Sequence, residues 1–268
     1  MMHPIHAAVL GLVEGVTEFL PVSSTGHLIL VAYLLGLRGE AVKTYEVVIQ
    51  AGALGAVLGL YRARLASVWQ GALGRDPAGR TLGRNLLLSF VPAAVAGLLL
   101  HRAIKRLFVP SLVGLALACG GVLMLAVEWT KSRRRPSTRP LESLTVPGAF
   151  FIGVLQCLAL WPGMSRSMVT IVGGLLLGLS PAAAAEYSFL LAVPTLGAAT
   201  LFDAVVSGRA LVQEAGALTV AIGFVIALLV AAAAIRGLLR YLSQHGLTLF
   251  GWYRLAVAGC IWWLGPQG

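Results

Sequence analysis

Charged side chains are scarce in this chain of 268 residues. Asp, Glu, Lys and Arg make up only 11% of it, whereas a soluble domain carries about 25%. Hydrophobic residues make up 58%, and the mean hydropathy is +0.88. This composition excludes an ordinary soluble domain. It predicts an all-α polytopic integral membrane protein, because runs such as 215–235 reach the roughly 20 apolar residues that a transmembrane helix needs.

Cysteines and acidic residues are also few. Cys119, Cys157 and Cys260 lie in apolar surroundings without metal-ligand spacing, which excludes a disulfide framework. The 10 acidic residues stand against 20 basic ones, so the formal net charge is +10. Because the basic residues are scattered between apolar segments, the excess favours contact with anionic membrane lipids. Nucleic acid is not expected as a partner.

Polar residues gather in one stretch, EGVTEFLPVSSTGH at 14–27. The apolar segment 4–20 predicts a helix that carries Glu14 and Glu18 near its end and stops at Pro21. Three side chains then offer N-caps for a second short helix: Ser23, Ser24 and Thr25. Each helix is too short to cross a bilayer alone. The pattern therefore indicates a re-entrant hairpin, whose break is tolerated where it lines a polar cavity.

A second polar stretch, PGMSRS, occupies 162–167 in the other half of the chain. It separates an apolar segment at 146–160 from a predicted short helix at 165–177. The order of apolar segment, proline break and serine-capped helix is the same as in the first stretch. It predicts a second re-entrant hairpin.

The two halves of the chain also align with an offset of about 140 residues, which pairs Pro21 with Pro162 and Ser24 with Ser165. Broken short helices in matching positions are typical of inverted-topology repeats that hold a site between them. We therefore expect a single membrane domain over 1–268 that contains an internal repeat. Its parts are repeat 1 at about 1–130, a basic linker at 131–140 and repeat 2 at about 141–268.

Further spans are predicted from the remaining apolar stretches, which are 46–60, 86–100, 111–127, 186–202, 215–239 and 247–264. The arginine-rich residues 61–84 and the linker are predicted to be polar loops. By the positive-inside rule, both loops face the cytoplasm.

Together the two breaks suggest an anion site. The N-terminus of each short helix exposes unpaired N–H groups and the positive end of the helix dipole. Two such ends that face each other favour phosphate, and Arg166 adds a guanidinium that can form two hydrogen bonds to it. His27 follows Ser24 by one helical turn. Glu14 and Glu18 share one face of their helix.

These residues also have simpler interpretations. Ser24 and Ser165 could serve only as N-caps, and His27 could be a buried core histidine. The two glutamates could form a structural ion pair with the arginine of the second stretch. Arg254, inside the last apolar segment, could extend along the helix to place its charge at the membrane interface.

The two polar stretches resemble a known family. EGVTEFLPVSSTGH at 14–27 and LALWPGMSRSMVT at 158–170 are similar to the undecaprenyl pyrophosphate phosphatase family, also called the bacitracin resistance family. KTYEVVIQ at 43–50 and EYSFLLAVP at 186–194 extend the resemblance over essentially the whole chain. It implies a multi-pass enzyme of the bacterial inner membrane whose active site faces the periplasm. Such an enzyme hydrolyses undecaprenyl diphosphate to undecaprenyl phosphate and phosphate, recycles the lipid carrier for peptidoglycan synthesis and confers bacitracin resistance.

The resemblance also implies roles for individual residues. The expected catalytic residues are Glu14, Glu18, Ser24, His27 and Arg166. The expected substrate-binding residues are Ser23, Thr25, Ser165, Ser167 and Thr170. Members of the family commonly have glycine directly after S-R-S, and this chain has Met168, which puts a larger side chain near the start of the second short helix.

The expected mechanism leaves the nucleophile open. Ser24 attacks with His27 or a glutamate as base and forms a phosphoserine, or His27 attacks directly or activates water. Glu14 and Glu18 hold a divalent cation, Mg²⁺ or Ca²⁺, on the diphosphate, or act as base. The competing function is a lipid or anion transporter or flippase without hydrolysis, which an inverted repeat with broken helices fits equally well. A homodimer is compatible with either function.

Overall fold

The structure, a computed structural model, describes residues 3–37, 40–131 and 138–264, so most of the predicted linker lies outside it. The described part is helical and contains no strand, only one isolated bridge between Arg139 and Leu179. The α-helices are α1 (Pro4–Thr17), α2 (Ser24–Leu34), α3 (Glu40–Leu60), α4 (Arg62–Ala72), α5 (Pro77–Lys105), α6 (Pro110–Lys131), α7 (Val146–Gln156), α8 (Arg166–Leu176), α9 (Pro181–Ala215), α10 (Ala217–Leu242) and α11 (Thr248–Leu264). Two 3-10 helices, η1 (Leu141–Ser143) and η2 (Cys157–Leu160), flank α7.

Several of these helices can span a membrane. Among the described residues, four are long and apolar enough: Pro77–Lys105, Pro110–Thr130, Pro181–Leu201 and Ala217–Leu242. A fifth span results if α3 and α4 are counted together, since they meet at a bend of 78°. The helices α1, α2, α7 and α8 are apolar but shorter, as the arms of hairpins should be. The all-α, polytopic fold is therefore confirmed.

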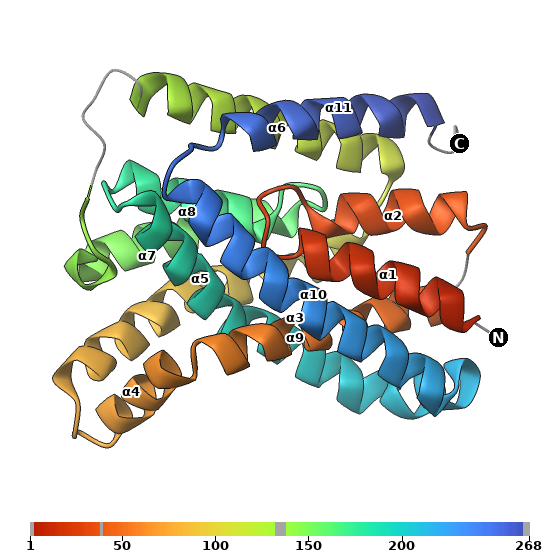
Figure 1. Cartoon of the computed structure of the whole chain (residues 1–268), viewed down its shortest axis with the longest axis horizontal. Coiled ribbons are helices and arrows are strands. Elements are labelled where there is room, and N and C mark those ends of the chain that lie inside the picture. The colour runs from red at the N-terminus through yellow and green to blue at the C-terminus, as the bar shows by residue number, and fades with distance from the viewer. Residues whose placement is uncertain (1–2, 38–39, 132–137, 265–268) are drawn as a thin grey trace.

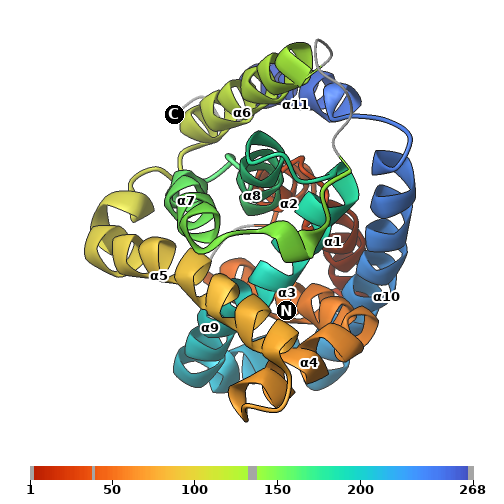
Figure 2. The same cartoon turned by 90° about the vertical axis from the view of Figure 1, so that its left-hand side faces the viewer.

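Of the short helices, α8 is buried over almost its whole length, whereas α1, α2 and α7 are only partly buried. In Figure 2, α2 and α8 lie near the centre, with α5, α6, α10 and α11 around them. Figure 1 shows α6 and α11 running side by side along one edge. α1 packs against α10, and α7 packs against α5, so each hairpin is flanked by a long helix from the other half of the chain.

The two hairpin breaks have the same backbone geometry. Ser23 and Ser165 both have a φ of 73°, in the left-handed region that residues other than glycine rarely adopt. Each is the N-cap of a helix of 11 residues, α2 or α8. Each of these helices is followed by a glycine with positive φ, Gly36 or Gly178. The two breaks are thus alike locally, whereas the internal repeat over the whole chain stays a prediction. The direction in which each hairpin enters the membrane stays a prediction.

This geometry shifts the register of the repeat by one residue. The structure pairs Ser23, and not Ser24, with Ser165. The counterpart of Ser24 is therefore Arg166, the first residue of α8. The predicted register was wrong because it aligned the prolines: Pro162 lies three residues before its N-cap serine, with Gly163 at a φ of 97° between them, whereas Pro21 lies two residues before Ser23.

The prediction of a loop over 61–84 was also wrong. Most of these residues belong to α4 and to the first turns of α5. Asp76 caps the N-terminus of α5, where its Oδ1 accepts hydrogen bonds from the N–H groups of Ala78 and Gly79. Arginine, glutamine, alanine and leucine are good helix formers, so the basic residues that suggested a loop lie on helices.

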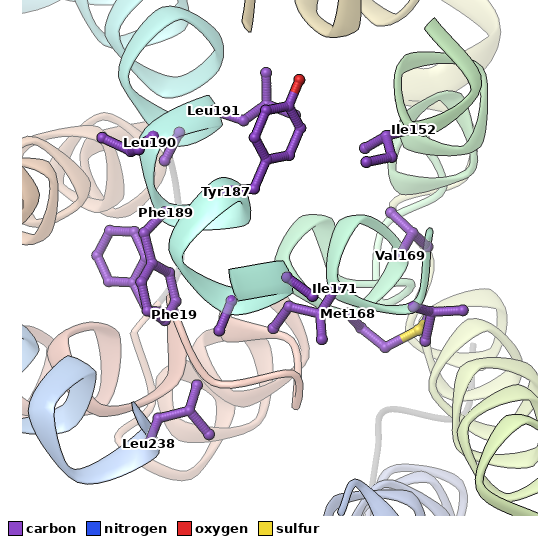
Figure 3. Close-up of a cluster of buried hydrophobic side chains, with 14 of the residues drawn as sticks. Phe19, Ile152, Met168, Val169, Ile171, Tyr187, Phe189, Leu190, Leu191 and Leu238 are labelled. Atoms are coloured by element: carbon purple, nitrogen blue, oxygen red, sulfur yellow. The ribbon is translucent and has the colours of Figure 1, made fainter. Parts of the chain in front are cut away.

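The hydrophobic core lies where the first hairpin break meets α8 and α9 (Figure 3). Phe19 and Phe189 meet edge to face, with 5.5 Å between their ring centroids. Met168 is fully buried, and its methyl group lies against Gly120 of α6. Such contacts hold the ends of both hairpins against the long helices, and the site lies between those ends.

Candidate active site

The two hairpin breaks meet at a cavity of about 170 Å³. Its lining residues are Glu18, Ser23, Ser24, Thr25, Gln50, Ala159, Pro162, Gly163, Ser165, Arg166 and Leu196. The N-termini of α2 and α8 therefore reach one cavity, which is the arrangement expected for an anion site. Six of the ten predicted site residues line it, and the remaining four lie outside its lining.

Ser24 presents its hydroxyl group to a carboxylate. The Ser24 Oγ donates a 2.6 Å hydrogen bond to Oε2 of Glu18. Ser23 takes the capping role instead, because its Oγ accepts a 3.4 Å hydrogen bond from the N–H of Gly26. The capping interpretation therefore applies to Ser23 and not to Ser24. A serine hydroxyl paired with a possible base has the geometry of an activated nucleophile.

Glu18 also pairs with Arg166 of the other hairpin. The Arg166 Nη2 donates a 2.9 Å hydrogen bond to Oε1 of Glu18, and both side chains are largely buried. The Arg166 Nη1 donates to the carbonyl oxygen of Ser188 at 2.8 Å. The buried Nε has no hydrogen-bond partner among the described residues, so one N–H of the guanidinium is left unsatisfied. The ion-pair interpretation is therefore right for Glu18, and it places the pair at the cavity wall.

His27 does not line the cavity, and it makes its hydrogen bonds to Ser23 and Tyr253. Its Nδ1 lies 2.7 Å from the carbonyl oxygen of Ser23, and because a carbonyl only accepts, Nδ1 carries a proton. In the neutral ring, Nε2 then accepts a 2.7 Å hydrogen bond from the hydroxyl of Tyr253. The two rings are stacked, with 5.5 Å between their centroids. In this arrangement Glu18, and not His27, is the base within reach of Ser24.

Ser165 and Ser167 connect the second hairpin to the first. Ser165 caps α8, because its Oγ accepts a 3.2 Å hydrogen bond from the N–H of Met168. Its Oγ also lies 3.0 Å from the Oγ of Ser167. Ser167 in turn donates a 2.9 Å hydrogen bond to the carbonyl oxygen of Leu20, in the break of the first hairpin. Ser165 lines the cavity, whereas Ser167 joins the two breaks behind it.

Thr170 lies behind Arg166. It is fully buried, and its Oγ1 is 2.8 Å from the carbonyl oxygen of Arg166 and 2.7 Å from the Oγ of Ser188. The carbonyl oxygen of Ser188 accepts the hydrogen bond from Arg166 described above. This geometry gives Thr170 a supporting contact to the arginine. Its predicted direct contact with substrate stays a prediction.

Met168 leaves the cavity clear. Its position in α8 corresponds to that of Gly26 in α2, and its side chain packs toward α6 instead of lining the cavity. The larger side chain therefore fills core space between α8 and α6.

Glu14 is the most buried acidic side chain among those that the structure describes. It is 1% exposed, it sits one helical turn before Glu18, and it does not line the cavity. Its Oε1 has no hydrogen-bond partner among the described residues. No group of three or more His, Cys, Asp or Glu side chains in the described part could hold a metal ion by itself. Carboxylates such as those of Glu14 and Glu18 are ligands that Mg²⁺ and Ca²⁺ accept, and the further ligands would have to come from a substrate phosphate.

The comparison with protein families shows to which family the chain belongs. The family described as bacitracin resistance protein BacA matches residues 7–260. The chain belongs to this family. The undecaprenyl-diphosphatase of Sorangium cellulosum is 52% identical over 265 residues, which cover 96% of this chain and 85% of that protein. Undecaprenyl-diphosphatase 2 of Rhodospirillum rubrum is 49% identical, with 94% and 91% covered. The undecaprenyl-diphosphatase of Paracoccus denitrificans is 44% identical, with 94% of each covered.

This bacitracin resistance family member has three residues at or beside the cavity that were not predicted from the sequence. Gln50 lines the cavity, the carbonyl oxygen of Ser188 accepts a hydrogen bond from Arg166, and the hydroxyl of Tyr253 binds His27. Gln50 and Ser188 belong to the two shorter stretches that resemble the family, KTYEVVIQ and EYSFLLAVP, so their signal was present. Arg254 does not line the cavity, and the interpretation that it extends to the membrane interface was wrong, because its side chain is fully buried.

Proposed function

We propose that this chain is an undecaprenyl-diphosphatase, which hydrolyses undecaprenyl diphosphate to undecaprenyl phosphate and phosphate. The observation that carries the proposal is the hydrogen bond from Ser24 to Glu18 beside Arg166, in a cavity that two helix N-termini reach. This combination exceeds what anion binding alone needs. The relatives named above carry the same activity in their names. The physiological role is recycling of the lipid carrier for peptidoglycan synthesis, with bacitracin resistance as its consequence.

In the proposed complex, the diphosphate occupies the cavity between the two helix N-termini. The free N–H groups and the positive dipole ends of α2 and α8 favour its charge. The Nε of Arg166, which has no partner among the described residues, donates to a phosphate oxygen. The hydroxyls of Ser23, Thr25 and Ser165 complete the polar wall. The prenyl chain extends along apolar helix surfaces, so only the headgroup enters the cavity.

The proposed reaction has two steps. The Ser24 Oγ attacks the terminal phosphorus while Glu18 accepts the hydroxyl proton, and the bond to the bridging oxygen breaks so that undecaprenyl phosphate leaves. Water then attacks the phosphoserine and releases phosphate. Arg166 stabilises the negative charge that develops on the transferred group. Direct attack by His27 is less well supported, because its Nε2 is bound to Tyr253.

We also propose that the enzyme uses a divalent cation, Mg²⁺ or Ca²⁺. Glu14 and Glu18 would hold it together with oxygens of the diphosphate, where it would neutralise phosphate charge. The protein residues keep their roles beside it: Ser24 attacks and Arg166 binds phosphate.

The proposed location is the bacterial inner membrane, with the cavity open to the periplasm. The arginines of α4 and of the start of α5 support this orientation, because the positive-inside rule assigns them to the cytoplasm. A homodimer would leave the site unchanged, since both hairpins that form the cavity belong to one chain.

The decisive experiment is release of phosphate from a polyprenyl diphosphate by the purified protein in detergent, with and without added Mg²⁺ or Ca²⁺. We expect release by the wild type and loss in Ser24→Ala and in Arg166→Ala. Substrate labelled in the terminal phosphate should leave label on the wild type after rapid quenching, and none on Ser24→Ala. A folded wild type that releases no phosphate under any metal condition would support the transporter or flippase instead.

A further inference from the structure

Arg254, in the middle of α11, has the largest side chain among the fully buried ones that the structure describes. A buried guanidinium is costly unless its donors are satisfied. Arg254 belongs to neither hairpin, and it does not line the active-site cavity. The family motifs at 14–27 and 158–170 do not contain it either. Its burial therefore requires an explanation of its own.

The hydrogen bonds that the guanidinium donates go to backbone carbonyl oxygens. Its Nη2 donates to Gly163 at 2.9 Å and to Met164 at 3.1 Å, both in the break of the second hairpin. Its Nη1 donates to Pro21 at 3.4 Å, in the break of the first hairpin. The remaining carbonyl partners, both in α6 at 3.2 Å, are those of Ala116 and Leu117.

The backbone carbonyl groups around Arg254 explain why a buried guanidinium is favourable at this position. Where a helix is broken, its carbonyl oxygens lose their partners within the helix and must find others when they are buried. One planar guanidinium with five N–H donors can serve both breaks at the same time. A lysine ammonium is a compact group with three donors, and it could not reach oxygens spread over two hairpins and α6 in the same way.

Gly120 of α6 makes room for the guanidinium. A Cβ atom at this position would lie about 2.2 Å from Nη2 and 2.8 Å from Cζ of Arg254. Such distances are too short for non-bonded atoms, so any larger residue at 120 would displace the guanidinium. The site for Arg254 is therefore built by α6 as well as by the hairpins.

The neighbouring residue acts on the same region. Tyr253 donates its hydroxyl hydrogen bond to His27, one turn into α2. Two consecutive residues of α11 thus contact the first hairpin, and one of them also contacts the second. α11 packs along α6 for most of its length, as Figure 1 shows. It thereby links the hairpin breaks to the long helices outside them.

We infer that Arg254 is a positioning residue that fixes the two hairpin breaks relative to each other, and so sets the distance across the cavity between Ser24 and Arg166. The inference rests on the proposed function in so far as it concerns turnover. Arg254 touches no substrate in this role. It acts through the backbone of Pro21, Gly163 and Met164, which lead into the two helix N-termini.

Two variants test the inference. Arg254→Lys keeps the positive charge but reduces the number of N–H donors. Gly120→Ala displaces the guanidinium while Arg254 stays in the chain. The matched control is Gly114→Ala, on the same helix, where the added methyl group meets the exposed Trp262 of α11. For both test variants we expect kcat to fall about tenfold or more with a smaller change in KM, because misaligned reacting groups slow the chemical step. The control should stay near the wild type.

Hydrogen–deuterium exchange in detergent gives a readout that does not depend on activity. In both test variants, the amides around 18–24 and 160–166 should exchange faster together, while Gly114→Ala should alter exchange only where α6 meets α11. Faster exchange confined to α6 and α11 in all three variants would overturn the inference, as would wild-type kcat in a folded Gly120→Ala. If Arg254→Lys does not fold, Gly120→Ala decides. If the wild type releases no phosphate, the proposed function fails, and the exchange experiment still tests the positioning role.

Discussion

The hydroxyl of Ser24 lies 2.6 Å from a carboxylate oxygen of Glu18, and this carboxylate belongs to the other arm of the same hairpin. The break at Pro21 brings them together, because it turns the start of α2 back toward the end of α1. The other carboxylate oxygen of Glu18 accepts from Arg166 of the second hairpin. One carboxylate thus touches both the proposed nucleophile and the proposed phosphate-binding group.

The first prediction concerns Glu18 as the base. Glu18→Gln keeps the size of the side chain and its ability to accept hydrogen bonds, but a neutral amide does not take up the serine proton. We expect kcat to fall by about 10²–10⁴-fold, the usual contribution of general base catalysis, with a smaller change in KM. The measurement is steady-state phosphate release in detergent.

The control for this prediction is Glu142→Gln, which also removes a carboxylate from an arginine pair. Glu142 pairs with Arg64 at 2.8 Å, and its side chain is 54% exposed, away from the cavity. The turnover of Glu142→Gln should match that of the wild type. A Glu18→Gln variant that keeps more than a tenth of the wild-type kcat would assign the proton transfer to another group.

The second prediction concerns the role of His27. Tyr253→Phe keeps the stacked ring but removes the hydroxyl that occupies Nε2. If His27 holds the start of α2 in place, loss of its hydrogen bond to the Tyr253 hydroxyl should lower kcat several-fold, since one hydrogen bond contributes about 1 kcal/mol. If His27 attacks phosphorus or activates water, freeing Nε2 should raise kcat instead. Tyr241→Phe is the matched control, because Tyr241 also stacks on a histidine, His245, outside the cavity lining.

Much of the site was predictable from the sequence, because its signals are local. Pro21 and Pro162 mark the breaks, and polar residues after them have few uses in an apolar chain other than capping and binding. An ion pair between Arg166 and the two glutamates was one of the interpretations open from the sequence, because a charge left alone in an apolar setting is costly, but the choice of Glu18 was not. What the sequence could not fix was the capping residue. Three hydroxyl side chains in succession offer the same chemistry, and only the positive φ of Ser23 decides among them.

Two other features were missed for different reasons, one local and one a matter of contacts between distant parts of the chain. Residues 61–84 looked like a loop because arginines interrupt them, whereas helix propensity and the Asp76 cap make them helical. Arg254 lies 90 residues in sequence from Met164, the nearest of its partners in the hairpin breaks. No periodicity or motif connects it to Pro21 or Gly163. Its role became visible only when the carbonyl oxygens that surround it were known.

The third prediction concerns pH and the cap of α5. The hydroxyl of Ser67, 2.5 Å from Oδ2, and the N–H of Gly79 hold the pKa of Asp76 below its usual range. A lowered pKa in the folded state means that the ionised cap adds stability above the unfolded-state pKa, and that this stability is lost as pH falls through the folded-state pKa. Asp76→Asn keeps a capping side chain but no charge. Its apparent Tm in detergent should lie below that of the wild type at pH 7, and the difference should shrink as the wild-type aspartate is protonated.

Turnover provides the control for Asp76→Asn, because Asp76 lies outside the cavity lining. Phosphate release at pH 7 and at a temperature below both transitions should equal that of the wild type. A Tm difference that stays constant down to acidic pH would show that the charge of Asp76 contributes nothing to the stability of the cap.

The last prediction concerns the divalent cation. Both oxygens of Glu18 already have protein partners, whereas Oε1 of Glu14 has none among the described residues. Binding of a cation together with the diphosphate should therefore depend strongly on Glu14, although Glu14 does not line the cavity. Chelation should lower phosphate release by the wild type, and Mg²⁺ or Ca²⁺ should restore it. In Glu14→Gln, the concentration of cation that gives half-maximal rate should rise about 10–100-fold, the usual effect of weakening a metal site. A Glu14→Gln variant with a lower kcat and an unchanged half-saturating cation concentration would contradict this role. Added metal would then not restore the rate, and the result would place Glu14 in proton transfer through Glu18.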